Sequence, residues 1–289
     1  MRLNIVITPG FLGRQMQEIP IQQRPIGIFD SGVGGLSVFK EVRKLLPFES
    51  ITYFADSGNC PYGSKTQEEI LFLARKNIEF FLEQNCKLIV IACNTITAVA
   101  IDHFRFEYII PFIGMEPALK PAALQTRTKK IGILATENTF NGRLFKQTFE
   151  KHANGLDVFI QPGNGLVELV EKGEQDSEAA RQLLERYLTP MMEKGADTLV
   201  LGCTHYPFLK DMIQKVTGNR LIIIDPSDAV AAQTKRILME HDLISDNRQT
   251  PRLSFFTTGE KTMAERFFSF AVKGPFRLEQ INRSTDQGI

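Results

Sequence analysis

The sequence predicts an α/β protein made of two similar three-layer α/β domains with mainly parallel sheets, related by a pseudo-twofold axis. Two observations support this prediction. Short apolar runs alternate with helical stretches of roughly 10–20 residues, which is typical of βαβ units and parallel sheets. After Pro121 the same order of strand, turn and helix starts again, so the chain contains an internal repeat.

In the first half, strands are predicted where apolar residues run together, at 26–29, 51–54, 88–92 and 109–113. Helices are predicted where apolar residues recur every three to four positions, at 36–46, 66–84 and 96–106. Pro47 ends the first of these helices, and Thr66 with Glu69 predicts a capping box at the start of the second.

In the second half, strands are predicted at 130–134, 157–160, 198–202, 221–224 and 253–257. Helices are predicted at 140–152, 166–172, 177–194, 208–216 and 260–272, with a further helix capped by residues 225–228. These patterns divide the chain into an N-terminal extension (1–24), a discontinuous first α/β domain (25–118 plus 226–272), a second α/β domain (119–225) and a frayed C-terminal tail (273–289). Hinges are expected near 115–121 and near 225.

Length and composition exclude several classes of protein. The chain has 289 residues, which fits two domains, and its net charge of +1 comes with no basic block or acidic tail, so no nucleic-acid partner is expected. No apolar run reaches the roughly 18 residues of a membrane helix, and residues 1–24 do not resemble a secretory signal. We therefore expect a cytoplasmic protein with reduced cysteines.

The cysteine and glycine patterns exclude other sites. The sequence has four cysteines but no CxxC, so no structural metal site is expected. The glycines at 32–35 lack the spacing of a dinucleotide or phosphate loop, and we expect them to let the backbone approach a small substrate. Cys60 is interpreted as a loop thiol, although it could line a site, and Cys86 as inert.

Two of the predicted strands end directly on a cysteine. Strand 88–92 is followed by Cys93, Asn94 and Thr95, and strand 198–202 is followed by Cys203, Thr204 and His205. In open parallel sheets, ligands bind at the carboxyl ends of the strands. If the two halves face each other, the two thiols approach one cleft from opposite sides.

Two opposed thiols suit proton transfer at a stereocentre. Inversion of a carbon needs one base that removes a proton from one face and one acid that returns a proton to the other. The free thiol has a pKa of about 8.5, which neighbours can lower. Asp30 and His205 lie at strand ends where they could exchange protons with the thiols. Asp30 could instead cap the following helix, and this alternative stays open.

Four ordered motifs resemble the glutamate racemases of the aspartate/glutamate racemase family, over about residues 25–270. The motifs are Ile28–Ser37, Pro61–Gly63, Ala92–Thr95 and Gly202–Pro207. The resemblance implies an enzyme without cofactor or metal that supplies D-glutamate for peptidoglycan, and a homodimer is a possible assembly. It implies that Cys93 deprotonates D-glutamate and Cys203 deprotonates L-glutamate.

The resemblance also implies residue roles around the thiols. The implied substrate contacts are Asp30, Ser31, Pro61, Tyr62, Gly63, Asn94, Thr95, Thr204 and His205. Asp30 is expected to assist Cys93, and His205 with Glu171 to assist Cys203. Glu168 is a rival of Glu171 for the assisting carboxylate.

Other functions stay open at this point. One alternative is an aspartate racemase or another two-cysteine isomerase. The residue after the second Cys-Thr is His205, as in the glutamate enzymes, where the aspartate enzymes have Glu. A second alternative is a two-lobed protein that binds an amino acid without reacting it. A third is a hydrolase that uses Cys93 alone as a nucleophile.

Overall fold

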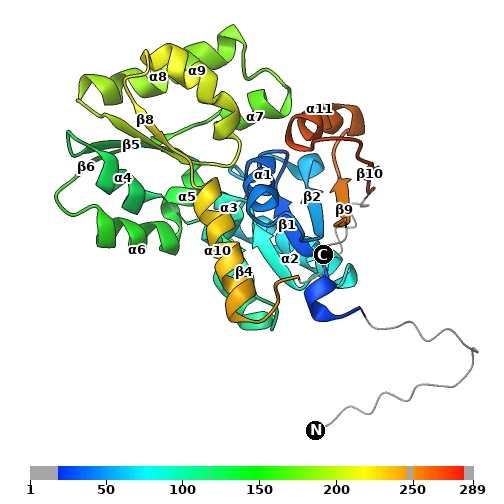
Figure 1. The fold of residues 1–289 in the computed structure, drawn as a ribbon. Helices are drawn as coiled ribbons and strands as arrows, with labels where there is room; N and C mark the ends of the chain where they lie inside the picture. The colour runs from blue at the N-terminus through cyan, green and yellow to red at the C-terminus, as the bar shows by residue number, and fades with distance from the viewer. Residues whose placement is uncertain (1–18, 117, 246–249, 283–289) are drawn as a thin grey trace, which may run out of the picture.

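The computed structural model describes residues 19–116, 118–245 and 250–282, which form two parallel sheets with helices on both faces (Figure 1). Most of the expected N-terminal extension, residues 1–18, lies outside the described residues, as do residues 283–289 of the expected tail. Residues Ile21–Gln23 form a short 3-10 turn, η1, before the first strand. Among the described residues, no helix is long and apolar enough to cross a membrane.

The first sheet has the strand order β10-β9-β2-β1-β3-β4, and all its pairings are parallel. Its strands are β1 (Ile26–Asp30), β2 (Ile51–Ala55), β3 (Leu88–Ile91), β4 (Phe112–Gly114), β9 (Leu253–Thr257) and β10 (Leu278–Gln280). The covering helices are α1 (Leu36–Leu45), α2 (Gln67–Glu83), α3 (Asn94–Glu107), α10 (Ser227–Glu240) and α11 (Lys261–Ala271). The 3-10 turn η2 (Ser57–Asn59) follows β2.

Neighbouring residues of the central strands point to opposite faces of this sheet, because side chains alternate along a strand. Ile28 and Tyr53 join the core formed with α1, α10 and α11, whereas Phe29 and Phe54 join the core formed with α2 and α3. Both faces are therefore buried. This explains why β1, β2 and β3 are continuous apolar runs instead of alternating sequences.

The second sheet has the order β6-β5-β7-β8 and is also parallel throughout. Its strands are β5 (Lys130–Ala135), β6 (Asp157–Pro162), β7 (Thr198–Gly202) and β8 (Ile222–Ile224). Its helices are α4 (Leu119–Gln125), α5 (Glu137–Asn141), α6 (Arg143–His152), α7 (Leu166–Glu171), α8 (Glu178–Glu193), α9 (Lys210–Thr217) and the 3-10 turn η3 (Tyr206–Leu209). This order repeats β2-β1-β3-β4 of the first sheet, so the predicted two-sheet α/β fold is confirmed.

Three predicted elements are wrong in their bounds. The helix expected at 140–152 is two helices, because the chain turns at Gly142, where an added Cβ would lie 2.6 Å from Cβ of Ala98 in α3. The strand expected at 109–113 begins only at Phe112, after Pro111, which has no N–H to donate to a ladder. The helix expected at 208–216 begins as the 3-10 turn η3 and continues as α9 over 210–217.

Besides the 3-10 turns η1 and η2, one strand and one helix were not predicted. Residues 278–280 of the expected frayed tail form β10, which pairs with β9 and buries Leu278. Helix α4 lies within the expected hinge region and packs against α6 and β7 of the second sheet. The predicted capping box of α2 is confirmed, since Thr66 and Glu69 cap each other's backbone N–H groups. The domain bounds and hinges stay predictions.

Candidate active site

A pocket of about 480 Å³ lies between the two sheets, where the carboxyl ends of strands from both meet. Both cysteines that follow strands line it: Cys93 comes after β3, and Cys203 comes directly after β7. Residues of both halves make up the lining. They are Ser31, Pro61, Tyr62, Gly63, Ser64, Cys93, Asn94, Thr95, Thr136, Gly163, Asn164, Val167, Glu168, Cys203, Thr204 and His205.

Most of the predicted site residues reach this pocket, but Asp30 and Glu171 do not line it. They lie behind the lining and contact residues that do. Asp30 ends β1 and is fully buried, and Glu171 ends α7 and is partly exposed. The structure therefore divides the predicted set into an inner group that faces the cavity and two carboxylates that support it.

Cys93 occupies the N-cap position of α3 and is almost completely buried. Its Sγ lies 3.6 Å from Oγ of Ser31, to which the thiol donates. Burial raises the pKa of the Cys93 thiol, and the Asp30 carboxylate raises it further, although a backbone N–H at Ile96 opposes this change. Cys93 is therefore a protonated thiol at neutral pH, ready to act as an acid.

Asp30 connects the two halves of the site. Its Oδ2 accepts hydrogen bonds from the Gly35 N–H at 2.7 Å and from Oγ1 of Thr204 at 3.2 Å. Gly35 is the N-cap residue of α1, so the helix-capping alternative describes part of what Asp30 does. Burial raises the pKa of Asp30, while nearby His205 and the Gly35 N–H oppose that rise. A carboxyl with a raised pKa can exchange protons with a thiol.

His205 stands between Cys203 and Glu171. Its Nδ1 lies 3.8 Å from Sγ of Cys203, and its Nε2 lies 2.6 Å from Oε1 of Glu171. Burial lowers the pKa of the imidazole, but hydrogen bonds with Cys203, Cys60 and Glu171 outweigh burial and hold the pKa well above its ordinary value. His205 therefore carries a proton at neutral pH and can supply it to Cys203.

The glycine turn after β1 makes room for this pair. A Cβ on Gly32 would lie 2.1 Å from Oε1 of Glu171, and a Cβ on Gly34 would lie 2.5 Å from Nδ1 of His205. The Val33 N–H also donates to Oε1 of Glu171 at 2.7 Å. The sequence predicted that this turn approaches a substrate. In the structure, the turn packs closely against Glu171 and His205.

Polar contacts tie the halves together beside the pocket. Oγ1 of Thr95 lies 2.9 Å from Oγ1 of Thr136, and the Asn138 amide donates to the Gly63 carbonyl at 3.1 Å. The Tyr62 hydroxyl donates to Asp56 at 2.5 Å, which fixes the ring at the pocket wall. The contact between Asn138 and Gly63 holds the Pro61–Gly63 motif against the second half.

The sequence missed several lining residues, namely Ser64, Thr136, Gly163, Asn164 and Val167. The internal repeat could have located Thr136. It directly follows β5, and Asp30 ends β1, the matching strand of the first sheet. The interpretation of Cys60 as a simple loop thiol is incomplete, since its Sγ lies within 4.8 Å of donor atoms of Glu171 and His205. The two candidates for the assisting carboxylate lie at different positions: Glu168 lines the pocket, and Glu171 contacts Nε2 of His205.

Comparisons with known proteins agree on one family. The family model described as Asp/Glu/Hydantoin racemase matches residues 26–234. The chain is 45% identical over 240 residues to a glutamate racemase of Herpetosiphon aurantiacus, covering 83% of this chain and 94% of that protein. This coverage on both sides means that the likeness extends over nearly the whole of that relative.

Solved structures give the same result. The chain is similar to glutamate racemase isoform RacE1 of Bacillus anthracis, with a TM-score of 0.81, 31% identity and coverage of 90% and 98% of the two chains. It is also similar to a Francisella tularensis glutamate racemase solved in complex with D-glutamate, with a TM-score of 0.77, 30% identity and coverage of 90% and 97%.

Proposed function

The chain belongs to the Asp/Glu/hydantoin racemase family, and from this premise we propose that it interconverts L- and D-glutamate by a two-base mechanism without a cofactor. The observation that supports the mechanism best is the shared pocket, which receives one thiol from each sheet. Single-nucleophile chemistry would need one thiol with its base. A second thiol with its own supporting groups is what inversion of a carbon requires.

The proposed step moves one proton in and one proton out. With L-glutamate, the thiolate of Cys203 takes the α-proton, and the electron pair that is left delocalises into the adjacent carboxylate. The thiol of Cys93 then donates its proton to the opposite face of the α-carbon, which gives D-glutamate. The reverse reaction exchanges the two roles. Because burial keeps Cys93 protonated in the free protein, this form is set up to receive the L-enantiomer.

The supporting groups reset the thiols between turnovers. His205 carries the proton that Cys203 loses and regains, and Glu171 orients the imidazole through Nε2. Asp30 has the corresponding part beside Cys93, where its raised pKa allows it to take the thiol proton. Fixed dipoles of the pocket lining stabilise the negative charge that develops on the α-carbon.

The remaining polar groups of the lining are the proposed substrate contacts. Asn94 and Thr95 lie at the N-terminus of α3, where backbone N–H groups favour a carboxylate. Oδ1 of Asn94 is buried with no hydrogen-bond partner among the described residues, which suits a substrate ammonium group. Ser31, Tyr62, Gly63 and Thr204 complete the wall.

The biological setting follows from the proposed reaction. D-Glutamate made here would enter peptidoglycan, and the reaction would take place in the cytoplasm, where thiols stay reduced. All four cysteines are free thiols in the structure, which fits such a setting. A homodimer is a possible assembly of the protein.

The deciding experiment incubates the purified protein with L-glutamate in deuterated water, without pyridoxal phosphate. We expect the circular dichroism signal of glutamate to fall to zero while the product gains one deuteron at the α-carbon. An unchanged signal would reject racemisation, and binding without deuteron exchange would favour the two-lobed binding protein. Faster reaction with L-aspartate would favour the aspartate enzyme.

Substitution of the thiols tests the two-base mechanism separately. We expect Cys93→Ser and Cys203→Ser each to lower kcat by at least about a hundredfold, the usual contribution of general acid–base catalysis. Circular dichroism in the far ultraviolet checks that both variants fold. If Cys203→Ser kept near-normal activity while Cys93→Ser lost it, a one-cysteine mechanism would replace the two-base mechanism.

A further inference from the structure

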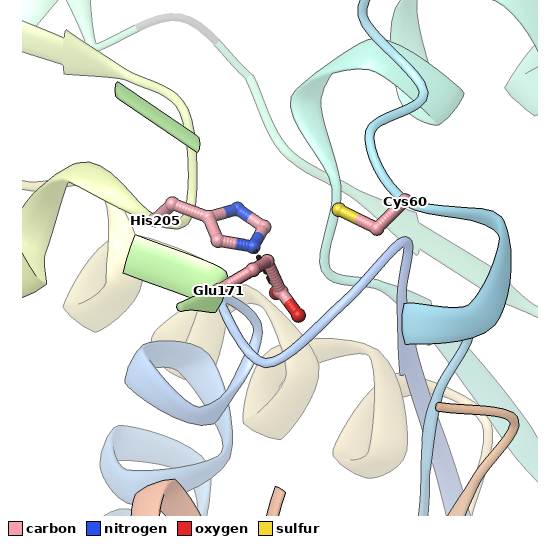
Figure 2. A group of neighbouring side chains, drawn as sticks. All are labelled: Cys60, Glu171 and His205. Carbon is pink, nitrogen blue, oxygen red and sulfur yellow. Dashed lines mark hydrogen bonds and ion pairs between the residues drawn. The ribbon is translucent and has the colours of Figure 1, made fainter. Parts of the chain in front are cut away.

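Cys60, Glu171 and His205 bring a thiol, a carboxylate and an imidazole to one point beside the active-site pocket (Figure 2). Their donor atoms all lie within 4.8 Å of one another. They come from three separate segments: the loop between η2 and α2, the end of α7, and the turn after β7. Figure 2 shows the Cys60 sulfur pointing toward the imidazole edge that also receives Glu171.

A second cavity, of about 710 Å³, adjoins the active-site pocket, because Pro61, Val167 and Glu168 line both. Cys60 and Glu171 both line it, whereas Cys60 does not line the active-site pocket. The charged residues of the second cavity are Glu168, Glu171, Glu260 and Lys172. Three carboxylates against one ammonium group make its field favourable for a cation.

We propose that Cys60, Glu171 and His205 form a binding site for one Zn²⁺ ion, and that zinc bound there inhibits the enzyme. Thiolate, imidazole and carboxylate are the ligands that zinc prefers in proteins. Three protein ligands leave the fourth tetrahedral position to water, which the second cavity can supply. The sequence contains no CxxC pattern that would predict this site, because its three ligands come from segments that are far apart in the chain.

The cluster needs only a small contraction to hold the ion. Zinc–sulfur bonds of about 2.3 Å and zinc–nitrogen bonds of about 2.0 Å place tetrahedral donor atoms roughly 3–4 Å apart. The observed limit of 4.8 Å between donor atoms is therefore about 1 Å too wide. Both hydrogen bonds that the described residues make to Glu171 end on Oε1, so Oε2 is available to the metal.

Proton competition sets the conditions for binding. Burial raises the pKa of the Cys60 thiol to about 12, despite an opposing hydrogen bond with His205. Zinc has to displace this proton and the proton on Nε2 of His205, so its affinity should increase with pH. The positive charge of the ion reverses the effect of burial, because a bound divalent cation stabilises a thiolate directly.

The inhibitory consequence rests on the proposed function, whereas metal binding itself does not. Zinc at Nε2 would displace the Nε2 proton and the hydrogen bond to Glu171, and would leave His205 with one proton, on the Nδ1 atom that faces Cys203. To give that proton to Cys203, His205 would have to become a metal-bound imidazolate, so it would be a much weaker acid than the imidazolium, while both catalytic thiols stay in place. Inhibition should lower kcat more than it raises KM for glutamate.

The binding test uses Co²⁺ as a spectroscopic substitute for zinc in the full-length protein. We expect one equivalent of Co²⁺ to give a thiolate-to-cobalt charge-transfer band that increases with pH and disappears on addition of Zn²⁺. Cys60→Ser should abolish the band. Cys86→Ser is the matched control, since Cys86 is a second free thiol that lies outside the cluster, and it should leave the band unchanged. Cys60→Ala serves as a second variant should Cys60→Ser fail to fold.

The activity test compares zinc inhibition of the same proteins. Zinc inhibition of each protein is expressed relative to its own rate without zinc. The zinc concentration that halves the rate should increase at least about tenfold in Cys60→Ser, and it should not change in Cys86→Ser. Equal inhibition of wild type and Cys60→Ser would overturn the proposal, as would a cobalt band lost in Cys93→Ser or Cys203→Ser instead. A wild-type protein that binds cobalt through Cys60 but never racemises glutamate would reject the proposed function alone.

Discussion

Two glutamates on the single turn of α7 show how closely spaced residues acquire different roles. Glu168 faces the active-site pocket, whereas Glu171 accepts from the Val33 N–H and contacts Nε2 of His205. The sequence alone does not separate them, because both lie near the turn that follows Gly165. The structure separates them by contact, and kinetics can test the difference.

We expect Glu171→Gln to lower kcat/KM by about 10²-fold, because the amide no longer stabilises the protonated imidazole that serves Cys203. Glu168→Gln is the matched control and should affect mainly KM. Steady-state kinetics in both directions measures the two variants. The loss in kcat/KM must be equal in the two directions, since the equilibrium constant of a racemase fixes their ratio. If Glu168→Gln lost more kcat than Glu171→Gln, then Glu168 would be the assisting carboxylate instead of Glu171.

The protonated His205 also predicts how stability depends on pH. Its folded-state pKa lies well above the unfolded value of about 6.5. The stabilisation by the bound proton is therefore complete below about pH 6.5 and is lost as the pH increases through the folded pKa. Thermal unfolding of wild type and His205→Asn should show the largest difference in melting temperature near pH 6. A difference that grows toward pH 9 would contradict a charged imidazole.

Single residues were predictable where a strand ends on a reactive group. Cys93, Cys203 and His205 stand at such ends, and the pattern located them. Thr136 and Asn164 were missed, because a threonine or an asparagine after a strand is common in any loop. The place of Cys60 was not predictable, since only the packing of the η2–α2 loop against α7 brings it to Glu171.

At the scale of elements, the start of α2 is a clear case in which local sequence determines local structure. Thr66 accepts from the Glu69 N–H at 3.2 Å, and Glu69 accepts from the Thr66 N–H at 2.8 Å. Both residues are exposed, so tertiary packing contributes little to this helix end. The helix carries the loop of Tyr62 and Gly63 at its N-terminus and thus helps to position one wall of the site.

Loss of this cap should be measurable in stability but not in catalysis. We expect Thr66→Ala to lower the free energy of unfolding by about 1 kcal/mol, with kcat nearly unchanged. Urea unfolding followed by circular dichroism measures the loss. The matched control is Thr189→Ala, an exposed threonine inside α8, which should not destabilise the protein. Equal destabilisation by both substitutions would assign the effect to something other than capping.

Elements were predictable where periodicity was strong and long. The buried strands β1, β2, β3, β5 and β7 appear close to their predicted bounds because both faces of each sheet are covered. The break at Gly142 was hidden, since the apolar spacing continues through it and only the close approach to Ala98 bends the chain. Strand β10 was missed because Leu278 is its one buried residue and a three-residue strand carries no clear pattern.

At the scale of the whole molecule, one buried ion pair joins distant parts of the first sheet. Lys87 Nζ lies 2.5 Å from Oε2 of Glu49 and donates to the Gln22 carbonyl at 2.6 Å, while the Ser245 N–H donates to Oε1 of Glu49 at 2.7 Å. Both charged side chains are almost fully buried. The pair thus connects η1, the starts of β2 and β3, and the segment after α10.

Removal of one charge should be costly, because it leaves the other buried and unpaired. We expect Lys87→Met to lower the free energy of unfolding by about 3–5 kcal/mol, measured by urea denaturation. The double variant Lys87→Met/Glu49→Gln should recover part of the loss, since it removes the unpaired charge and keeps an acceptor for Ser245. The exposed pair of Lys44 and Glu41 is the control, and Lys44→Met should change stability by less than about 1 kcal/mol. A double variant less stable than Lys87→Met would contradict this explanation.

The place of β9 in the first sheet has a consequence for protein synthesis. Strand β2 pairs with β1 on one side and with β9 on the other, yet β9 begins only at Leu253. A ribosome therefore completes the entire second sheet before it makes the strand that covers β2. During that interval the growing chain presents an open strand edge next to Tyr53 and Phe54, and such edges invite pairing with other chains. The order of translation thus makes the first sheet the last to be finished, and a chaperone that shields β2 would protect the nascent enzyme through most of its synthesis.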